Sequence, residues 1–223
     1  SRLKTMGYED AFFASLMVRS KEVAHKVADR IFQYDGIRGQ PYDDLACPEW
    51  LVEPYISVVN TENYEAPRWL EVSDLPPLSC GSRRLSDTHV EAVLTALSWS
   101  SLEQSHSLVT AIRENIDAEV RDAFCCRLFR LWLEEQAPPA DCWAMAAMGL
   151  LGGEHSARLL EPELRNWKYA SEKTQVELGL QCLHRIGTPL ALELLGNLSN
   201  KLSKRSLRVR ASEFLRVSRS EKA

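Results

Sequence analysis

The sequence predicts an all-α protein built from antiparallel helix pairs. Apolar residues recur at spacings of three and four through most of the chain, and strict alternation typical of a strand is almost absent. Six of the ten prolines lie between residues 41 and 77, which separates an irregular segment from the regular ones. Two stretches near the C-terminus, 151–167 and 186–202, repeat one pattern of turn and helix. These three observations define an N-terminal helix, a proline-rich segment and a repetitive helical region.

Residues 1–40 are expected to hold one long helix over 8–33, ended by Gly36 and Gly39. Its apolar stripe is Phe13, Leu16, Met17, Val23, Val27 and Ile31. Residues 41–85 follow, and their prolines disfavour long regular elements. Aromatic and branched side chains there, such as Trp50, Tyr55 and Trp69, are too apolar for disorder. We expect an ordered, mostly irregular wrap over the helices, with one short strand or helix near 54–60.

Residues 86–223 are expected to form successive helices with short turns. Several side chains are placed to cap helix N-termini: Ser86 or Asp87, Ser101 with Gln104 as a capping box, Asp117, and Asp141. Pro138 and Pro139 interrupt the pattern, and Gly152 and Gly153 form a turn. Four more helices are predicted at about 155–167, 171–186, 189–202 and 205–217, and Thr188-Pro189 is the strongest of their start signals.

The two similar stretches align with an offset of about 35 residues. The paired positions are Met148 with Leu183, Leu151 with Ile186, Ala157 with Ala191, Leu160 with Leu194 and Leu164 with Leu198. Two helices per unit at this period are typical of a helical solenoid, in which each pair buries its apolar face against the next. The repeat therefore predicts an α-solenoid of HEAT-like antiparallel helix pairs, with the proline-rich wrap after the first helix.

Charge is distributed unevenly along the chain. The whole sequence carries a net charge of -4, but residues 201–223 hold eight Lys or Arg and two acids, so the preceding 200 residues carry -10. A basic end on an acidic body can meet nucleic acid or an acidic partner, although charge runs usually mark solvated surface. The candidate partner-binding residues are Lys201, Lys204, Arg205, Arg208, Arg210 and also Trp167, whose place at a helix end suggests exposure.

The sequence offers no constellation typical of an active site or a cofactor site. Cys182 and His184 are the nearest approach to a metal-ligand pair, but residues two apart on a helix point in different directions. Glycine-rich phosphate loops and the nucleophile elbow are missing. We therefore expect no catalytic residues, no metal and no cofactor. The six cysteines form no Cys-x-x-Cys pair and no signal peptide is visible, so reduced thiols and a cytoplasmic location are expected.

Four segments resemble, in order, a region of large bacterial proteins described as predicted molybdate-metabolism regulators, which carry a domain of unknown function, often with a WGR domain. The segments are "LPPLSCGSRRLSDTHVEAVLTALSWSS", "LFRLWLEEQAPPADCWAMAAMGLLGG", "LEPELRNW" and "GLQCLHRIGTPLALELLGNLSNKL". The resemblance covers roughly residues 66–217. It implies a HEAT-like helical fold and an interaction or regulatory role, and it supplies no catalytic residues.

Three functions remain open at this point. The first is a non-catalytic scaffold that binds a protein partner or another domain of a larger chain. The second is a nucleic-acid-binding protein that uses the basic C-terminal helix, for which steep salt dependence is expected. The third is a hydrolase or transferase whose site is assembled across helices. No membrane span of roughly 20 apolar residues is present, so no membrane partner is expected.

Overall fold

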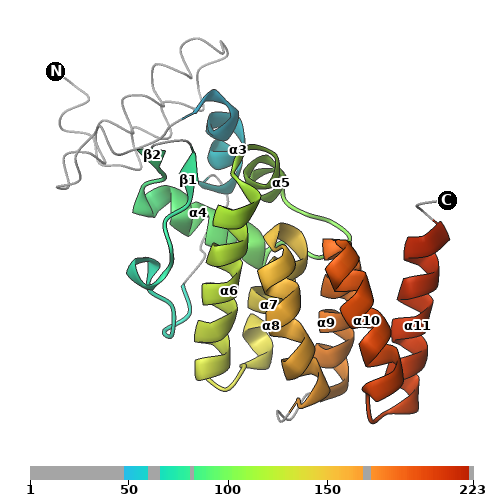
Figure 1. The fold of residues 1–223 in the computed structure, drawn as a ribbon. Coiled ribbons are helices and arrows are strands. Elements are labelled where there is room, and N and C mark those ends of the chain that lie inside the picture. Colours follow the sequence, from blue (N-terminus) through green and yellow to red (C-terminus); the bar gives the residue numbers. More distant parts are fainter. Residues whose placement is uncertain (1–47, 60–65, 81–82, 168–171, 221–223) are drawn as a thin grey trace, which may run out of the picture.

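A computed structural model describes residues 48–59, 66–80, 83–167 and 172–220, and these residues are almost entirely helical (Figure 1). The expected helix over 8–33 and the whole segment 1–40 lie outside the described residues. The elements run in the order α3 (Glu49–Val59), η3 (Val72–Asp74), β1 (Ser79–Cys80), β2 (Arg83–Arg84), α4 (Asp87–Ser98), α5 (Ser107–Asn115), α6 (Ala118–Glu134), η4 (Pro139–Asp141), α7 (Trp143–Leu151), α8 (Glu154–Arg165), α9 (Glu172–Ile186), α10 (Pro189–Lys201) and α11 (Arg205–Ser220).

The all-α prediction is confirmed for the described part of the chain. The exception is a hairpin of two residues per strand, which was not predicted from the sequence. Its register pairs Ser79 with Arg84 and Cys80 with Arg83 in antiparallel fashion. Strands this short depend on their neighbours for stability, so the hairpin is a local feature of the proline-rich segment.

Contacts between helices follow an alternating pattern from α6 onward. The helices α6, α8 and α10 contact one another in sequence, and α7, α9 and α11 do the same in a second row. Neighbours such as α6 and α7, or α10 and α11, also pack together across the two rows. Figure 1 shows these helices standing side by side, with α11 at the end of the series. Each helix therefore buries its apolar side against the helices before and after it.

The α9–α10 and α7–α8 turns are closed in different ways. Thr188 caps α10 as predicted, because its side chain accepts from the N–H of Ala191, and Pro189 occupies the first helical position. Gly187 before it adopts a φ of +63°, a left-handed conformation that favours glycine. The α7–α8 turn has no cap of its own, since Gly153 has no side chain to offer. Its cap is the carboxylate of Asp122 in α6.

Three predicted caps differ from the structure. Ser101 does accept from the N–H of Gln104, but the pair closes a turn, and α5 begins later with the His106 imidazole accepting from Leu108. Asp117 occupies the cap position of α6 without a side-chain hydrogen bond. Asp141 lies one residue before Cys142, which is the cap residue of α7. Ser86 caps α4 as predicted.

The proline-rich segment packs against the helices, as expected. A short strand or helix near 54–60 is predicted, and the structure has a helix there: α3 begins earlier, at Glu49, and continues through Pro54. Loss of one backbone donor at Pro54 is tolerated because α3 buries Leu51, Val52, Tyr55 and Val58. Further along, the Trp69 indole donates to the Asp141 carboxylate at 2.9 Å and stacks on Trp143. Asp141 thereby ties this segment to the start of α7 instead of capping it.

A buried histidine in α4 predicts sensitivity to mild acid. His89 is 1 % exposed, its Nδ1 lies 2.9 Å from the Ser86 hydroxyl, and burial lowers its pKa to about 3. The unfolded chain has the ordinary pKa of about 6.5, so protons bind the unfolded state first and stability falls as the pH drops below that value. Between pH 7 and pH 5 we expect a loss of about 2 kcal/mol of unfolding free energy from this group. Urea titrations should show a smaller loss for His89→Gln; an equal loss in both proteins would contradict this account.

Candidate functional site

The basic C-terminal residues lie on and just before α11, the last helix of the series. Lys201 ends α10, Lys204 lies in the turn, and Arg205 begins α11; all three side chains are exposed. α11 contacts α9 and α10 through one side. Its buried positions include Leu207 and Ala211. The other side of α11 is therefore exposed to solvent.

Two of the five predicted basic residues, Arg208 and Arg210, are used inside the fold. The Arg208 guanidinium donates to the carbonyl oxygens of Leu202 and Ser203, where α10 has ended and its carbonyls lack helical partners. Arg210 forms ion pairs with Glu177 of α9 at 3.3 Å and with Glu213 at 3.1 Å. Both guanidinium groups thus hold the last helix in place, and their assignment as partner-binding residues stays a prediction.

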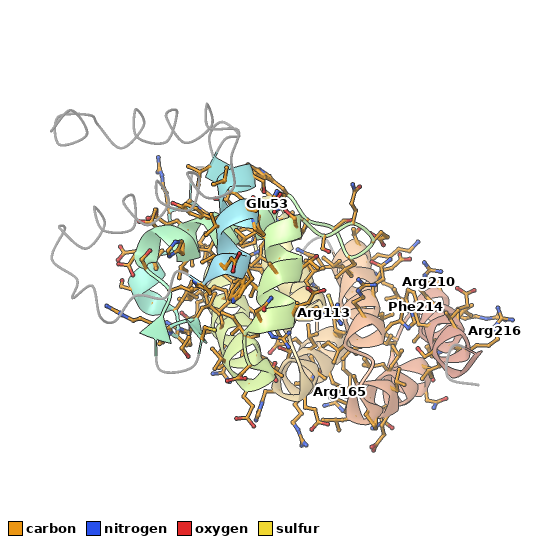
Figure 2. The ribbon with its side chains drawn as sticks, turned by 90° about the horizontal axis from the view of Figure 1, so that it is seen from above. Glu53, Arg113, Arg165, Arg210, Phe214 and Arg216 are labelled. Atoms are coloured by element: carbon orange, nitrogen blue, oxygen red, sulfur yellow. The ribbon has the colours of Figure 1, made fainter. Side chains whose placement is uncertain are left out.

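The Arg210 side chain is part of a cluster that joins α9 to α11. Its guanidinium lies 4.5 Å above the Phe214 ring, which stacks on His184 of α9 (Figure 2). The imidazole Nδ1 of His184 lies 2.7 Å from the Ser218 hydroxyl. The Cys182 thiol donates to the carbonyl of Met145 in α7. Cys182 and His184 therefore contact different neighbours and do not form a metal-ligand pair.

This cluster predicts different outcomes for two neighbouring arginines. Arg210→Ala removes two ion pairs and the stacking on Phe214, and should lower the unfolding free energy by about 1–2 kcal/mol. Arg205→Ala, on the exposed side of the same helix, should change it by less than about 0.5 kcal/mol. Chemical denaturation of both variants measures the difference. Equal effects would show that the cluster does not stabilise α11.

The prediction that Trp167 is exposed is wrong. It is 8 % exposed, and its ring packs on Trp132 of α6 with centroids 6.0 Å apart. The indole N–H donates to Gln175, whose amide in turn donates to the carbonyl of Ala137. α8 has already ended at Arg165, so the chain folds back over the end of α6 and covers it with the indole. Trp167 is a core residue with a satisfied polar atom.

The exposed side of α11 carries a mixed surface that we call the α11 outer face. It consists of Arg205, Val209, Ser212 and Arg216, and the exposed Val217 lies at its flank. Val209 is 50 % exposed and Val217 is 40 % exposed, and they are two of the three most exposed large apolar side chains among the described residues. A shallow depression of about 430 Å³ follows this face. Figure 2 shows Arg216 projecting away from the helices at the end of the series.

The periodicity of apolar residues in the sequence of α11 indicates which side of the helix is exposed. Leu207, Ala211 and Phe214 mark the packed side of α11, at spacings of four and three. Positions 205, 209, 212 and 216 fall on the opposite side of a 3.6-residue helix. Charge alone does not separate the two sides of α11, so the basic residues predicted from the sequence come from both sides.

A second cluster brings Asp122, Cys126, His155 and Ser156 together at the start of α8. Asp122 is buried and accepts from the backbone N–H groups of Gly153, His155 and Ser156 at 2.8–2.9 Å, and from the Ser156 hydroxyl. Burial by itself raises the pKa of Asp122, but these four hydrogen bonds outweigh it and hold the pKa below its ordinary value. The carboxylate is thus a cap for α8 supplied by another helix.

The neighbouring residue completes this contact with the turn. The Arg121 guanidinium donates to the carbonyl of Leu151, the last residue of α7, at 3.2 Å. Arg121 and Asp122 therefore bind the two sides of the Gly152-Gly153 turn. A side chain at Gly153 would place its Cβ 2.9 Å from an Asp122 carboxylate oxygen, which explains the glycine there.

The buried thiols are poor nucleophiles. Burial raises the pKa of Cys126, and it raises that of Cys125 well above the ordinary value. The same effect raises the pKa of Cys182 to about 12. The thiolate is the reactive form of cysteine, so these groups stay protonated and unreactive at neutral pH. In the cluster around Asp122, the carboxylate caps the N-terminus of α8, and the neighbouring Cys126 thiol stays protonated.

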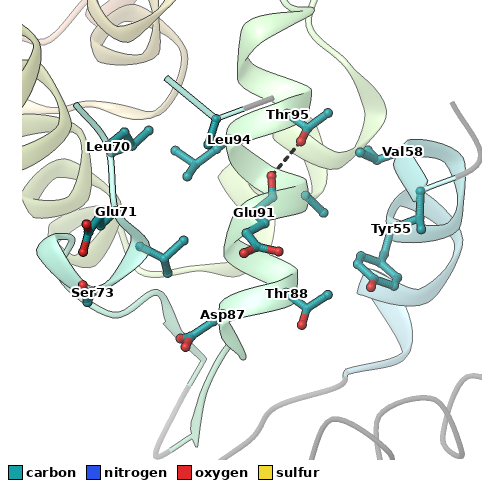
Figure 3. Close-up of a pocket in the computed structure, with 14 residues that line it drawn as sticks. Tyr55, Val58, Leu70, Glu71, Ser73, Asp87, Thr88, Glu91, Leu94 and Thr95 are labelled. Carbon is teal, nitrogen blue, oxygen red and sulfur yellow. Dashed lines mark hydrogen bonds between the residues drawn. The ribbon is translucent and has the colours of Figure 1, made fainter. Parts of the chain in front are cut away.

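A larger groove of about 790 Å³ lies where α3, η3 and α4 meet (Figure 3). Its floor is apolar and includes Val58, Leu70 and Leu94, while its rim carries the carboxylates of Glu71 and Asp87. The Thr95 hydroxyl donates to the backbone carbonyl of Glu91, a bond within α4. The acidic rim of this groove contrasts with the basic α11 outer face at the other end of the molecule.

Two further properties bear on function. Within residues 48–59, 66–80, 83–167 and 172–220, no three His, Cys, Asp or Glu side chains are grouped closely enough to hold a metal ion. In the same part of the chain, every helix is too short or too polar to cross a membrane.

Comparison with known proteins adds one relative. Over 142 residues the chain is 27 % identical to "Uncharacterized protein YehI" of Escherichia coli (strain K12). The match covers 64 % of this chain but only 12 % of that protein, so the chain spans a small part of its relative's length. No protein-family model matches the sequence, and no solved structure gives a significant match.

Proposed function

We propose that the chain is a non-catalytic helical-repeat scaffold, a HEAT-like solenoid, that binds a protein partner in a regulatory assembly. The α11 outer face carries this proposal, because Val209 is exposed on it and Val217 is exposed at its flank. A helix face with exposed valines is suited to covering by another protein surface.

Other observations support the scaffold over an enzyme. The cluster that resembles chemical machinery, around Asp122, is used to cap α8. The alternating contacts of α6 to α11 support a solenoid arrangement, in which each helix pair packs on the next. The resemblance to the molybdate-metabolism regulator family favours a regulatory role. The described cysteines are free, which agrees with a reducing compartment such as the cytoplasm.

Nucleic-acid binding is the second candidate, and the exposed Lys201, Arg205 and Arg216 favour it. Phosphate contacts need cations but not exposed valines. The salt dependence of binding to labelled duplex or single-stranded DNA tests this candidate. Arg205→Glu with Arg216→Glu is the appropriate variant, because reversing Arg208 and Arg210 would disrupt contacts that hold α11 in place.

Co-purification from the native host tests the scaffold proposal. Tagged wild-type chain should retain a protein that Val209→Asp loses, with a depletion of about tenfold or more for a buried apolar contact replaced by a charge. Ala123→Asp, at an exposed position of α6, is the matched control and should retain the partner. Equal thermal unfolding of the two variants excludes a folding defect. If no retained protein depends on Val209, the proposal is wrong.

A further inference from the structure

A cleft of about 400 Å³ lies where α5, α7 and α9 meet. Its floor is apolar and consists of Val109 of α5 and Leu150 of α7, both nearly fully buried. Two arginines line it from different helices, Arg113 of α5 and Arg185 near the end of α9. Its volume is within the range of roughly 300–1,000 Å³ that is typical of small-molecule sites. The fold therefore brings two cationic side chains, far apart in the sequence, to one cleft.

Neither arginine of this cleft helps to hold the fold together. Among the residues that the structure describes, no carboxylate forms an ion pair with the guanidinium of Arg113 or Arg185. Both side chains are exposed. Arg208 and Arg210 differ in this respect, because carbonyl oxygens or carboxylates already bind their guanidinium groups. The positive charges of the cleft are thus available to a ligand.

Two hydroxyl groups add to the polar lining of the cleft. Ser105 and Thr110 lie at the start of α5, and their oxygens are 3.1 Å apart. Thr110 also donates to the carbonyl of His106 at 3.4 Å, a long and therefore weak bond. A hydroxyl hydrogen rotates to suit its acceptor, so both groups can turn to donate to an anion. Thr110 and Arg113 are three residues apart on α5 and share one side of the helix.

Electrostatics at the cleft favour an anion, although one acid is present. Glu114 lines the cleft and is exposed. Arg113 acts on a further cation: burial and, after it, the charge of Arg113 lower the pKa of Arg121, whereas neighbouring acidic groups raise it. An anion bound to Arg113 would reduce this repulsion between two guanidinium groups.

A groove of about 750 Å³ between α6 and α8 also contains arginines, but it is less suited to an anion. Its arginines share the space with the carboxylates of Asp74 and Glu119, and Arg127 is already paired with Glu134. The cleft of α5, α7 and α9 contains a single carboxylate, that of Glu114. Of the two, the smaller cleft is therefore the better anion site.

We propose that the cleft between α5, α7 and α9 binds a small phosphate-bearing molecule, with the phosphate group between Arg113 and Arg185. A phosphate monoester carries about 1.5 to 2 negative charges at neutral pH, which two guanidinium groups match. Arginine donates paired N–H groups to phosphate oxygens, and Ser105 and Thr110 add hydroxyl donors. The site is separate from the α11 outer face. The inference therefore goes beyond the proposed scaffold and can fail without it.

Calorimetric titration of the full chain with phenyl phosphate at constant ionic strength tests the proposal. Arg113→Gln with Arg185→Gln should weaken binding about 25-fold, from about fivefold for each exposed ion pair. Arg68→Gln with Arg84→Gln removes the same charge at exposed positions outside the cleft and should bind like the wild type. Thermal unfolding of both variants should match that of the wild type. Absence of saturable binding to the wild type, or equal losses in the two variants, would overturn the proposal.

Glu114→Gln gives a test of opposite sign. Its carboxylate competes with phosphate for the arginines, so the variant should bind phenyl phosphate about two- to threefold more tightly. Glu119→Gln, at an exposed position of α6, makes the same change outside the cleft and should leave the affinity unchanged. Unchanged or weaker binding by Glu114→Gln would overturn the proposal.

Other ligands distinguish the sources of the anion. Inorganic phosphate that binds as tightly as phenyl phosphate would assign the affinity to the phosphate group alone, and weaker binding would show that the organic part contributes; both results support the proposal. Succinate that binds as tightly as phosphate would assign the cleft to a dicarboxylate and overturn it. Labelled duplex DNA that binds the wild type but not Arg113→Gln with Arg185→Gln would assign the arginines to nucleic acid and also overturn it.

Discussion

Asp122→Ala should lower the unfolding free energy by about 3 kcal/mol, because four hydrogen bonds to one buried carboxylate are lost at once. Three of the donors are backbone N–H groups at the start of α8 that have no partner within their own helix. The Gly152-Gly153 turn offers no replacement side chain. Guanidinium titration followed by circular dichroism measures the loss.

Asp117→Ala is the matched control for this variant. Asp117 occupies the cap position of α6 but makes no side-chain cap bond, so its removal should cost less than about 1 kcal/mol. Similar losses for the two variants would contradict the role assigned to Asp122.

The pH dependence of stability provides a second test of the Asp122 carboxylate. The pKa of Asp122 in the native state lies below that of the unfolded chain, so its stabilisation is complete above a pH of about 4. It is lost as the pH falls through the native pKa. The difference in stability between wild type and Asp122→Ala should therefore be constant from pH 7 to about 5 and shrink at lower pH. A difference that grows on acidification would contradict the lowered pKa.

Gly149→Ala should cost about 2 kcal/mol, although alanine favours helices over glycine by about 1 kcal/mol. An added Cβ at Gly149 would lie 2.9 Å from the Cα of Cys182 and 2.7 Å from a methyl carbon of Leu102. The first of these is backbone, so α7 and α9 would have to move apart. Close-packed interiors resist such shifts.

Gly196→Ala is the control for this second prediction. Its added Cβ would lie 3.7 Å from Leu215, an ordinary contact, so the variant should gain about 0.5–1 kcal/mol from helix propensity. Thermal unfolding of the two alanine variants should shift in opposite directions. A stabilised Gly149→Ala would show that α7 and α9 are less closely packed than described.

Local chemistry explains which parts of the fold were predictable. The bounds of α8 to α10 were predicted to within a few residues, because Thr188, Pro189 and the glycine turns act on their own neighbours. The cap from Asp122 was not predictable in this way, since it joins residues about 30 positions apart through tertiary packing. Ser101 shows the converse case: its local hydrogen bond forms as expected, yet no helix follows directly, because the packed positions begin at Leu108.

The candidate site was predicted only as a region. Composition placed it at the basic C-terminal end, but the rotation of α11 about its axis decides which cations face solvent. Packing on α9 turns Arg210 toward Glu177 and leaves Arg205 outside. Trp167 was misplaced for a related reason: a tryptophan after a helix end can fold back over the core, and Gln175 supplies the acceptor that its indole needs.

Site-specific photo-crosslinking in the native host is the most direct test of the α11 outer face as a docking surface. A photoreactive side chain at Ser212, in the middle of the α11 outer face, should crosslink to a distinct protein partner. The same group at the exposed position Ala123 on α6 should not crosslink to that partner. The account predicts a protein adduct from position 212 that Val209→Asp removes. No adduct from 212, an equal adduct from 123, or an adduct with nucleic acid would contradict it.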